Sequence, residues 1–221
     1  MVRIMRSIAG LGLLAAAVSG CVPKHPRSQA SVIVEEDPKS SAWQAIASAA
    51  DRSRIDRVTA AWTAGLAEAR SFHDAIAEEG LLLKPGAALA RPAPTPGSYR
   101  CRLVTLGRDL KKGPAFERFK PFFCYVGLEG ELFTIVKQTG SQRPAGRLWE
   151  DDVATRLVFL GTLALGSEEE ARGYGDDPRR DMAGLFERVA PFRWRLVIPY
   201  PQDGGKLDVF ELTPVADQPA P

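Results

Sequence analysis

Two hydrophobic periods divide the chain. From about residue 41 to residue 79, large apolar side chains recur at every third or fourth position, which is typical of one buried face of an α-helix. Asp51 follows a break in this pattern and can cap a second helix, so the period fits either one kinked helix or two helices. Gly80 ends the pattern. The predicted apolar face consists of Trp43, Ile46, Ile55, Val58, Trp62, Leu66, Ala69, Phe72 and Ile76.

A proline-rich segment, residues 84–97, follows the helical region. Proline lacks a backbone N–H donor and disfavours helical geometry in the residue before it, so a helix cannot continue through this segment. We interpret the segment as an ordered arm or a connector to the second half of the chain.

From Tyr99 onward the hydrophobic period changes to two, which predicts β-strands. Short turns favour antiparallel neighbours, because parallel strands need long crossovers. Eight successive antiparallel strands suit a closed up-and-down barrel, in which no strand edge stays exposed. The predicted fold is therefore α+β, a helical segment followed by an antiparallel barrel; a β-sandwich or a half-open roll is the alternative. The predicted strands are Tyr99–Leu106, Pro121–Gly127, Glu131–Gln138, Gly146–Glu150, Thr155–Leu165, Met182–Val189, Phe192–Pro199 and Lys206–Thr213.

The beginning of the chain predicts secretion and lipid attachment. Arg3 and Arg6 precede the apolar run Ile8–Val18. This run of about eleven residues is too short to cross a hydrocarbon core, which needs roughly 20, and the layout is typical of a secretory signal peptide. Val18-Ser19-Gly20-Cys21 resembles the bacterial lipobox, with valine in place of the usual leucine. We therefore predict that Cys21 is lipidated; the alternative is a buried cysteine at the end of a short core helix.

These features predict a lipid-anchored protein of the cell envelope. No aspartate occupies the two positions after Cys21, which favours the outer membrane, facing the periplasm, over the inner membrane. The predicted division of the chain is a signal peptide (1–20), a flexible tether (21–40), a helical region with its connector (41–97), an antiparallel β domain (98–215) and a C-terminal tail (216–221).

The composition fits a folded domain. Of the 221 residues, 45% are hydrophobic and 25% are charged. The formal net charge is +2, and the chain becomes neutral when Arg3 and Arg6 leave with the signal peptide. This balance gives no reason to expect a nucleic-acid partner.

The cysteines predict a disulfide. If Cys21 carries lipid, Cys101 and Cys124 remain as a pair in an oxidising compartment, where disulfides persist. The alternative is two free buried thiols. The sequence contains two histidines, His25 and His73, and no Cys-x-x-Cys spacing. We therefore expect no metal and no cofactor.

Four motifs resemble one known family: Tyr99-Arg100-Cys101-Arg102, Thr139-Gly140-Ser141-Gln142-Arg143, Phe159-Leu160-Gly161 and Arg193-Trp194-Arg195-Leu196-Val197-Ile198-Pro199. The family is domain of unknown function 4893, found in secreted proteins and lipoproteins of Gram-negative bacteria. The similarity covers Trp43 to Pro214, and it implies no activity or substrate. The chain also resembles, more loosely, the lipocalin-like barrels in strand count and in its N-terminal helical piece. It lacks their Gly-x-Trp motif, so their ligands are not transferred to it.

A cluster of arginine and tryptophan is the best candidate for a binding surface. Guanidinium groups bind carboxylates or phosphates, and tryptophan rings stack on sugars or cations. The alternative is that the arginines pair across strands with Glu187, Asp208 or Glu211 while the tryptophans fill the core. Arg143, in the predicted loop 140–146, is the hardest to explain as packing. The candidate ligand-binding residues are Arg143, Trp149, Arg188, Trp194 and Arg195, with Arg147 and Arg193 beside them.

The candidates for catalysis are weaker, and we predict no catalytic residue. His73 fits a solvated helix surface better than a Ser–His pair. The acidic runs Glu150-Asp151-Asp152 and Asp176-Asp177 can form exposed turns as well as an acid–base pair. Residues 173–181 contain oxygen ligands without the spacing of a calcium loop.

Three hypotheses for function follow. The leading one is a non-enzymatic lipoprotein that binds a small amphipathic ligand or an envelope protein; it predicts an open apolar pocket near Arg143 and Trp149. The second is a structural or assembly protein, with a filled barrel and an exposed apolar stripe along Trp43–Ile76. The third is a carboxylate-dependent hydrolase, with two carboxylates in a cleft.

Overall fold

A computed structural model describes residues 38–108, 113–166, 168 and 171–216. The predicted signal peptide, the lipidation site Cys21 and most of the predicted tether lie outside these residues. None of the described helices is long and apolar enough to span a membrane.

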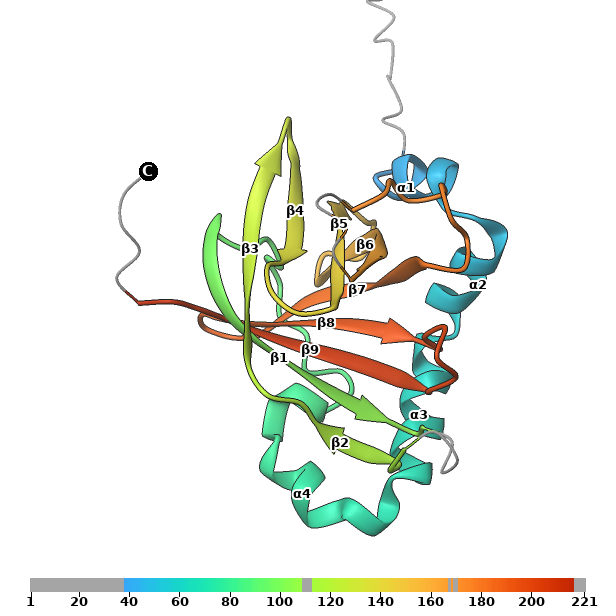
Figure 1. Cartoon of the computed structure of the whole chain (residues 1–221), viewed down its shortest axis with the longest axis vertical. Helices are drawn as coiled ribbons and strands as arrows, with labels where there is room; N and C mark the ends of the chain where they lie inside the picture. The colour runs from blue at the N-terminus through green and yellow to red at the C-terminus, as the bar shows by residue number, and fades with distance from the viewer. Residues whose placement is uncertain (1–37, 109–112, 167, 169–170, 217–221) are drawn as a thin grey trace, which may run out of the picture. The chain divides into compact units, whose positions relative to one another are not determined.

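The helical region contains more breaks than its period predicts (Figure 1). The Ser48 hydroxyl accepts a hydrogen bond from the Asp51 N–H at 3.1 Å, so Ser48, and not Asp51, is the N-cap of the second helix. The prediction of one or two helices is wrong, because the chain breaks again at Arg57 and at Phe72. Gly80, with φ +56°, follows the last α-helix. The helices are α1 (Ser40–Ile46), α2 (Ala49–Asp56), α3 (Val58–Glu68), η1 (Arg70–Phe72), α4 (His73–Glu78) and η2 (Gly80–Leu83).

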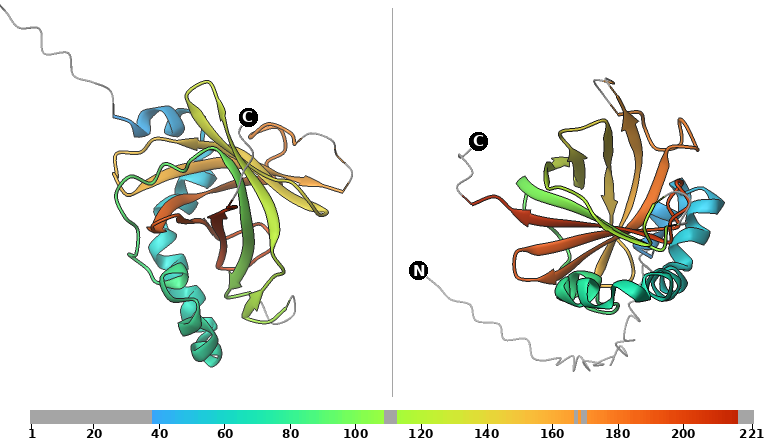
Figure 2. Two further views of the ribbon diagram at one scale, coloured as in Figure 1. Left: turned by 90° about the vertical axis from the view of Figure 1, so that its left-hand side faces the viewer. Right: turned by 60° about the horizontal axis from the view of Figure 1, so that its bottom comes forward.

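The second half of the chain is a closed antiparallel barrel (Figures 1 and 2). β1 pairs with β9 over eight register positions, from Tyr99↔Pro214 to Leu106↔Leu207, and this pairing closes the sheet. The α+β prediction with an eight-stranded barrel is confirmed, and the sandwich and half-open alternatives are excluded. The strands are β1 (Gly97–Leu106), β2 (Phe116–Arg118), β3 (Phe122–Glu129), β4 (Leu132–Lys137), β5 (Gln142–Trp149), β6 (Arg156–Leu165), β7 (Asp181–Ala190), β8 (Arg193–Pro199) and β9 (Leu207–Pro214).

Two details of the strand prediction need correction. The short strand β2 was not predicted; it pairs with the end of β1, beyond the part of β1 that pairs with β3. β5 begins at Gln142, earlier than its predicted start at Gly146. Arg143 therefore lies in a strand and not in a loop.

A pair of glycines allows β5 and β6 to approach closely. Gly146 and Gly161 are register partners. A Cβ atom added to Gly146 would lie 2.5 Å from Gly161 Cα and 2.5 Å from Leu160 O, so only glycine fits.

Apolar residues form one core inside the barrel and a second layer outside it. Val104, Val197 and Val209 face outward and pack under the helices, while alternate residues of the same strands face inward. Trp43 and Trp62 are only 4% and 6% exposed. Most of the predicted apolar stripe is therefore packed against the barrel wall and not presented to solvent.

The predicted disulfide is present. Cys101 on β1 and Cys124 on β3 are joined, with their Cα atoms 6.0 Å apart. They are not direct register partners: Cys101 lies opposite Phe122, and Cys124 lies opposite Tyr99. The bridge therefore runs diagonally between the two strands, within the interior core.

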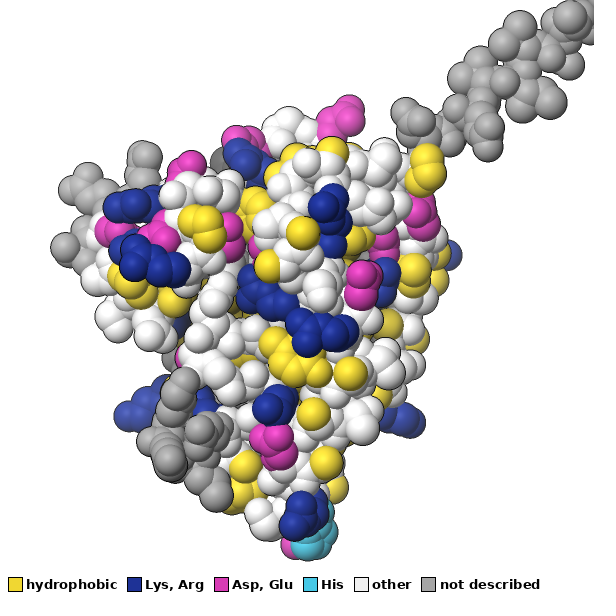
Figure 3. Space-filling model, turned by 90° about the vertical axis from the view of Figure 1, so that its right-hand side faces the viewer, with side chains coloured by type: hydrophobic (Ala, Val, Ile, Leu, Met, Phe, Trp, Pro, Cys, Tyr) yellow, Lys and Arg dark blue, Asp and Glu magenta, His cyan; other side chains and the backbone are white. Residues whose placement is uncertain are grey.

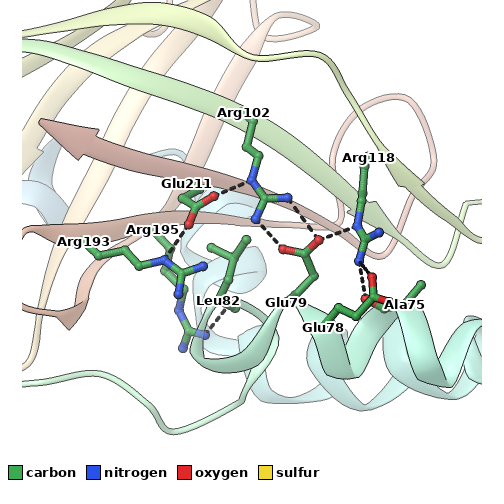
Figure 4. A network of polar contacts seen from close by, with 9 residues as sticks. All are labelled: Ala75, Glu78, Glu79, Leu82, Arg102, Arg118, Arg193, Arg195 and Glu211. Carbon is green, nitrogen blue, oxygen red and sulfur yellow. Dashed lines mark hydrogen bonds and ion pairs between the residues drawn. The ribbon is translucent and has the colours of Figure 1, made fainter. Parts of the chain in front are cut away.

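A seam of arginine and glutamate joins the end of α4 to the outer barrel wall (Figure 4). Glu79, whose side chain is 3% exposed, binds both Arg102 of β1 and Arg118 of β2. Arg102 also binds Glu211 of β9, which in turn binds Arg193. The two arginines hold the pKa of Glu79 below its ordinary value although burial opposes this. The helices are thus held to the barrel by buried ion pairs as well as by apolar contact.

The solvent side of the helices is mixed in character. On this face, basic and acidic side chains are interspersed with small hydrophobic areas (Figure 3). Ile46 is 48% exposed, an exception to the buried stripe.

Candidate functional site

One end of the barrel is closed by aromatic side chains and the proline-rich connector. Tyr99 and Trp194 pack edge to face, with ring centroids 5.9 Å apart. Trp194 Nε1 donates to the Pro92 carbonyl at 2.9 Å, and the Tyr99 hydroxyl donates to the Thr95 carbonyl at 2.6 Å. The connector is therefore tied across this end.

The opposite end contains a cavity in two parts. The inner part has a volume of about 140 Å³ and the outer part about 620 Å³. The inner wall is mainly apolar, whereas the region shared by both parts is mainly polar. The inner apolar wall includes Pro144, Leu163, Met182, Ile198 and Phe210. The shared residues are Leu103, Lys137, Gln142, Asp203 and Asp208.

Asp208 is an inward-facing carboxyl group at the start of β9. Its chain neighbours Leu207 and Val209 pack under the helices, so the alternation of the strand directs Asp208 into the barrel. Its Oδ1 atom is buried and has no hydrogen-bond partner among the described residues. Burial raises the pKa of Asp208 to about 7; the nearby charge of Asp203 adds to this rise and Arg108 opposes it.

Lys137 faces the same cavity from the end of β4. Its Nζ lies 4.2 Å from the centre of the Phe122 ring. Burial lowers the pKa of Lys137, the charge of Arg143 lowers it further, and no carboxylate in the described part of the chain offsets these effects. The ammonium group thus lies in a partly apolar site without a counterion there.

The arginines at this end are, by contrast, already paired. Arg108 lies 3.0 Å from Glu117 and 3.2 Å from Asp203. Arg180 lies 2.7 Å from Glu168, and Arg54 pairs with Asp51. Lys137 and Asp208, however, form no ion pair within the described residues.

The family model for a domain of unknown function (DUF4893) matches residues 43–212. The chain belongs to this family. The match spans the four motifs named above and confirms the predicted resemblance. No curated protein and no solved structure matches the chain. The role of this DUF4893 protein must therefore be argued from its own cavity.

The barrel separates the five residues predicted to form a binding surface. Arg143 and Trp149 lie on the outward register of β5; the inward neighbour Pro144 lines the cavity instead. Arg143 donates to the carbonyls of Gly140, Gly166 and Glu168, and so joins two loops. Trp149 packs against the layer beneath α1 and α2. Neither Arg143 nor Trp149 lines the cavity described above.

The other three predicted residues serve the fold in separate places. Arg195 is 1% exposed, pairs with Glu187 at 2.7 Å, and donates to the carbonyls at the end of η2. Arg188 donates to the Ala90 carbonyl in the connector. Trp194 lies inside the closed end. For Arg193 and Arg195, the alternative of cross-strand pairing with glutamate is confirmed.

The acidic candidates also lie in structural contacts. Asp151 accepts a hydrogen bond from Trp43 Nε1 at 3.1 Å, and Asp152 accepts one from Ser40, so both hold α1. Asp176 accepts from the Gly173 N–H within its own loop. No cluster of three or more potential metal-ligating side chains occurs among the residues the structure describes. His73 is 78% exposed on α4.

The sequence contained one sign of the cavity. Lys137 and Asp208 occupy inward positions of predicted strands, where charged residues are rare unless they have a partner. The cavity combines an apolar wall with an ammonium group and with a carboxyl group whose pKa is about 7. Such polar groups can bind an oxyanion or exchange a proton with it.

Proposed function

We propose that this DUF4893 protein is a lipid-anchored lipoprotein of the cell envelope whose barrel binds a small amphipathic ligand. One observation carries the binding role: the barrel is sealed at the Tyr99–Trp194 end and hollow at the other, with polar groups above an apolar wall. The inner part, about 140 Å³, is close to the roughly 150 Å³ that holds benzene in an engineered core. The outer part, about 620 Å³, is within the usual range for ligand pockets.

The anchor is inferred from the first 21 residues. Cleavage before Cys21 would leave that thiol to carry the lipid, and two or more acyl chains hold a protein stably on a membrane. The Cys101–Cys124 disulfide supports an oxidising compartment. We place the protein on the outer membrane, facing the periplasm, because no aspartate follows Cys21.

We assign the barrel a binding rather than a catalytic or assembly role. The carboxylates first considered for acid–base chemistry, Asp151 and Asp152, are engaged with α1. The apolar stripe considered for subunit docking is largely covered by the barrel wall. The cavity is the remaining feature of the described structure that suits a partner.

The binding role is tested by filling the cavity. Leu163→Trp places a large ring in the inner part, and Val136→Trp places the same ring on the outer wall, where Val136 is 41% exposed. We expect the wild type and Val136→Trp to bind 3-phenylpropionate or its amide in calorimetric titrations, and Leu163→Trp to lose this binding. Equal binding by Leu163→Trp, or no binding of either probe by the wild type, would overturn the proposal.

The anchor is tested separately. We expect metabolic labelling with palmitate to mark the wild type and not Cys21→Ser. An unlabelled wild type would remove the lipoprotein assignment and leave the cavity argument untouched.

A further inference from the structure

Two polar groups that line the cavity indicate the chemistry of the ligand. Asp208 Oδ1 is buried without a hydrogen-bond partner among the described residues, as is the hydroxyl of its register partner Thr105. Lys137 reaches the same cavity from β4, is half-buried, and has the Phe122 ring 4.2 Å from its ammonium group. Buried polar groups are rarely left unpaired, so a bound molecule with matching groups is a physical explanation for the unpaired Asp208 oxygen.

Most of the other charged groups around the cavity are already engaged. Arg108, in the segment after β1, and Asp203, in the β8–β9 turn, bind each other. Asp181, at the start of β7, accepts a hydrogen bond from the Gly175 N–H at 3.0 Å. Arg179 binds Asp177 and is 91% exposed. Arg54 and Arg180 have the ion pairs given above, and Lys120 is exposed at the rim.

The two inner groups suit an anion. An ammonium group in an apolar site regains stability when an anionic oxygen approaches it. A neutral carboxyl group in the same cavity leaves this attraction intact, whereas an ionised one would repel the anion. A second negative charge on the ligand would find no second unpaired cation on the inner wall, within the described residues, which favours a single charge.

We infer that the cavity binds a small carboxylate with a compact, benzene-sized apolar group, whose oxyanion pairs with Lys137 Nζ while Asp208 faces the same cavity. This inference rests on the proposed binding function and specifies its ligand class. The apolar group lies against Leu163, Ile198 and Phe210, and the carboxylate lies beside Lys137 at the end of β4.

The arrangement makes binding dependent on pH. Asp208 titrates at about pH 7. Below that pH its carboxyl group is neutral; above it the ionised group, beside Asp203, repels the ligand. The affinity for a carboxylate therefore falls as the pH rises, and the affinity for a neutral analogue stays constant.

Calorimetric titration of the intact protein with 3-phenylpropionate and with 3-phenylpropionamide tests the inference. The two probes share one apolar group, and the acid is ionised throughout the range used. At about pH 6, we expect the carboxylate to bind about tenfold more tightly than the amide, since hydrogen bonds to charged groups are the stronger ones. At about pH 8.5 this preference is lost.

Three variants assign the effect to its residues. Lys137→Met should abolish the preference for the carboxylate while the amide still binds. Asp208→Asn should remove the pH dependence. Lys84→Met, at the exposed first residue of the connector, is the matched control and should behave as the wild type. If Lys137→Met folds poorly by circular dichroism, Lys137→Gln replaces it.

The outcomes separate the inference from the function on which it rests. If neither probe binds the wild type, the proposed binding function fails. If both bind with equal affinity, or if Lys137→Met and Lys137→Gln keep the preference, the cavity binds ligands and the inferred ligand class is wrong.

Discussion

Asp208→Asn is predicted to stabilise the fold at neutral and alkaline pH. In the folded protein the pKa of Asp208 is about 7, against an ordinary value of 3.8. The folded state therefore holds its proton more tightly than the unfolded state does. Between about pH 4 and pH 7 the unfolded chain ionises first, so the free energy of unfolding of the wild type falls as the pH rises through this window, and it is constant above it.

The size of the effect follows from the same two values. Their difference, at about 1.4 kcal/mol per pKa unit, corresponds to about 4 kcal/mol. Because the cavity opens to solvent at its rim, water can reduce this cost, and we expect about 2–4 kcal/mol. Asparagine cannot ionise, so the variant lacks this loss of stability.

Urea unfolding at a series of pH values measures the prediction by linear extrapolation. We expect the wild type and Asp208→Asn to be about equally stable near pH 4 and the variant to be the more stable by about 2–4 kcal/mol near pH 8. Asp74→Asn, at a carboxylate that is 92% exposed, accounts for the general effect of removing one negative charge. A difference between wild type and Asp208→Asn that does not change with pH, or that decreases as the pH rises, would refute the reasoning.

Three further predictions concern the fold. Glu79→Gln should destabilise by about 2 kcal/mol in urea unfolding, because it removes a buried carboxylate shared by two partly exposed arginines, which still pair with Glu211 and Glu78. Since the pKa of Glu79 is lowered, this contribution is present above about pH 4.5 and is lost as the pH falls further. Glu129→Gln, at an exposed pair, should change little. Reducing the Cys101–Cys124 bridge should lower the free energy of unfolding by about 3 kcal/mol, and equal stability with and without reductant would contradict this. Gly146→Ala should lower the melting temperature, because its Cβ would meet backbone atoms at 2.5 Å.

The alternation of apolar residues predicted the barrel strands, but it could not predict two local features. β2 has only three residues, Phe116–Arg118, too few to show a period. Pro144 lies within β5, and proline normally argues against a strand, so the prediction began two residues too late to include it. At the helix breaks, Arg57 lies over the Tyr200 ring and Phe72 packs against Phe116, long-range contacts that no local pattern describes.

The residues predicted to form a binding surface are dispersed over the fold for a different reason. Arginine and tryptophan were selected by residue type, and both types also serve structural roles that depend on strand register. Arg143 and Arg195 each donate to several backbone carbonyls, because a guanidinium group has five donors in a fixed fork. Their positive charge can be read from the sequence. The carbonyls that accept their hydrogen bonds come close to them only when the chain folds.

The inward position of Lys137 could have been derived from the sequence, given the disulfide. Cys101 and Cys124 must lie on the same face of the sheet to be joined. If the disulfide is buried in the core of a closed barrel, that face is the inner one. A hairpin between β3 and β4 then sets Cys124 directly opposite Lys137, and directly opposite residues share a face. The lysine therefore had to point inward, where an ammonium group needs a counterion. Asp208 lies on the same inner wall, yet no carboxylate among the described residues offsets the charge of this lysine, so its ammonium group is available to a ligand.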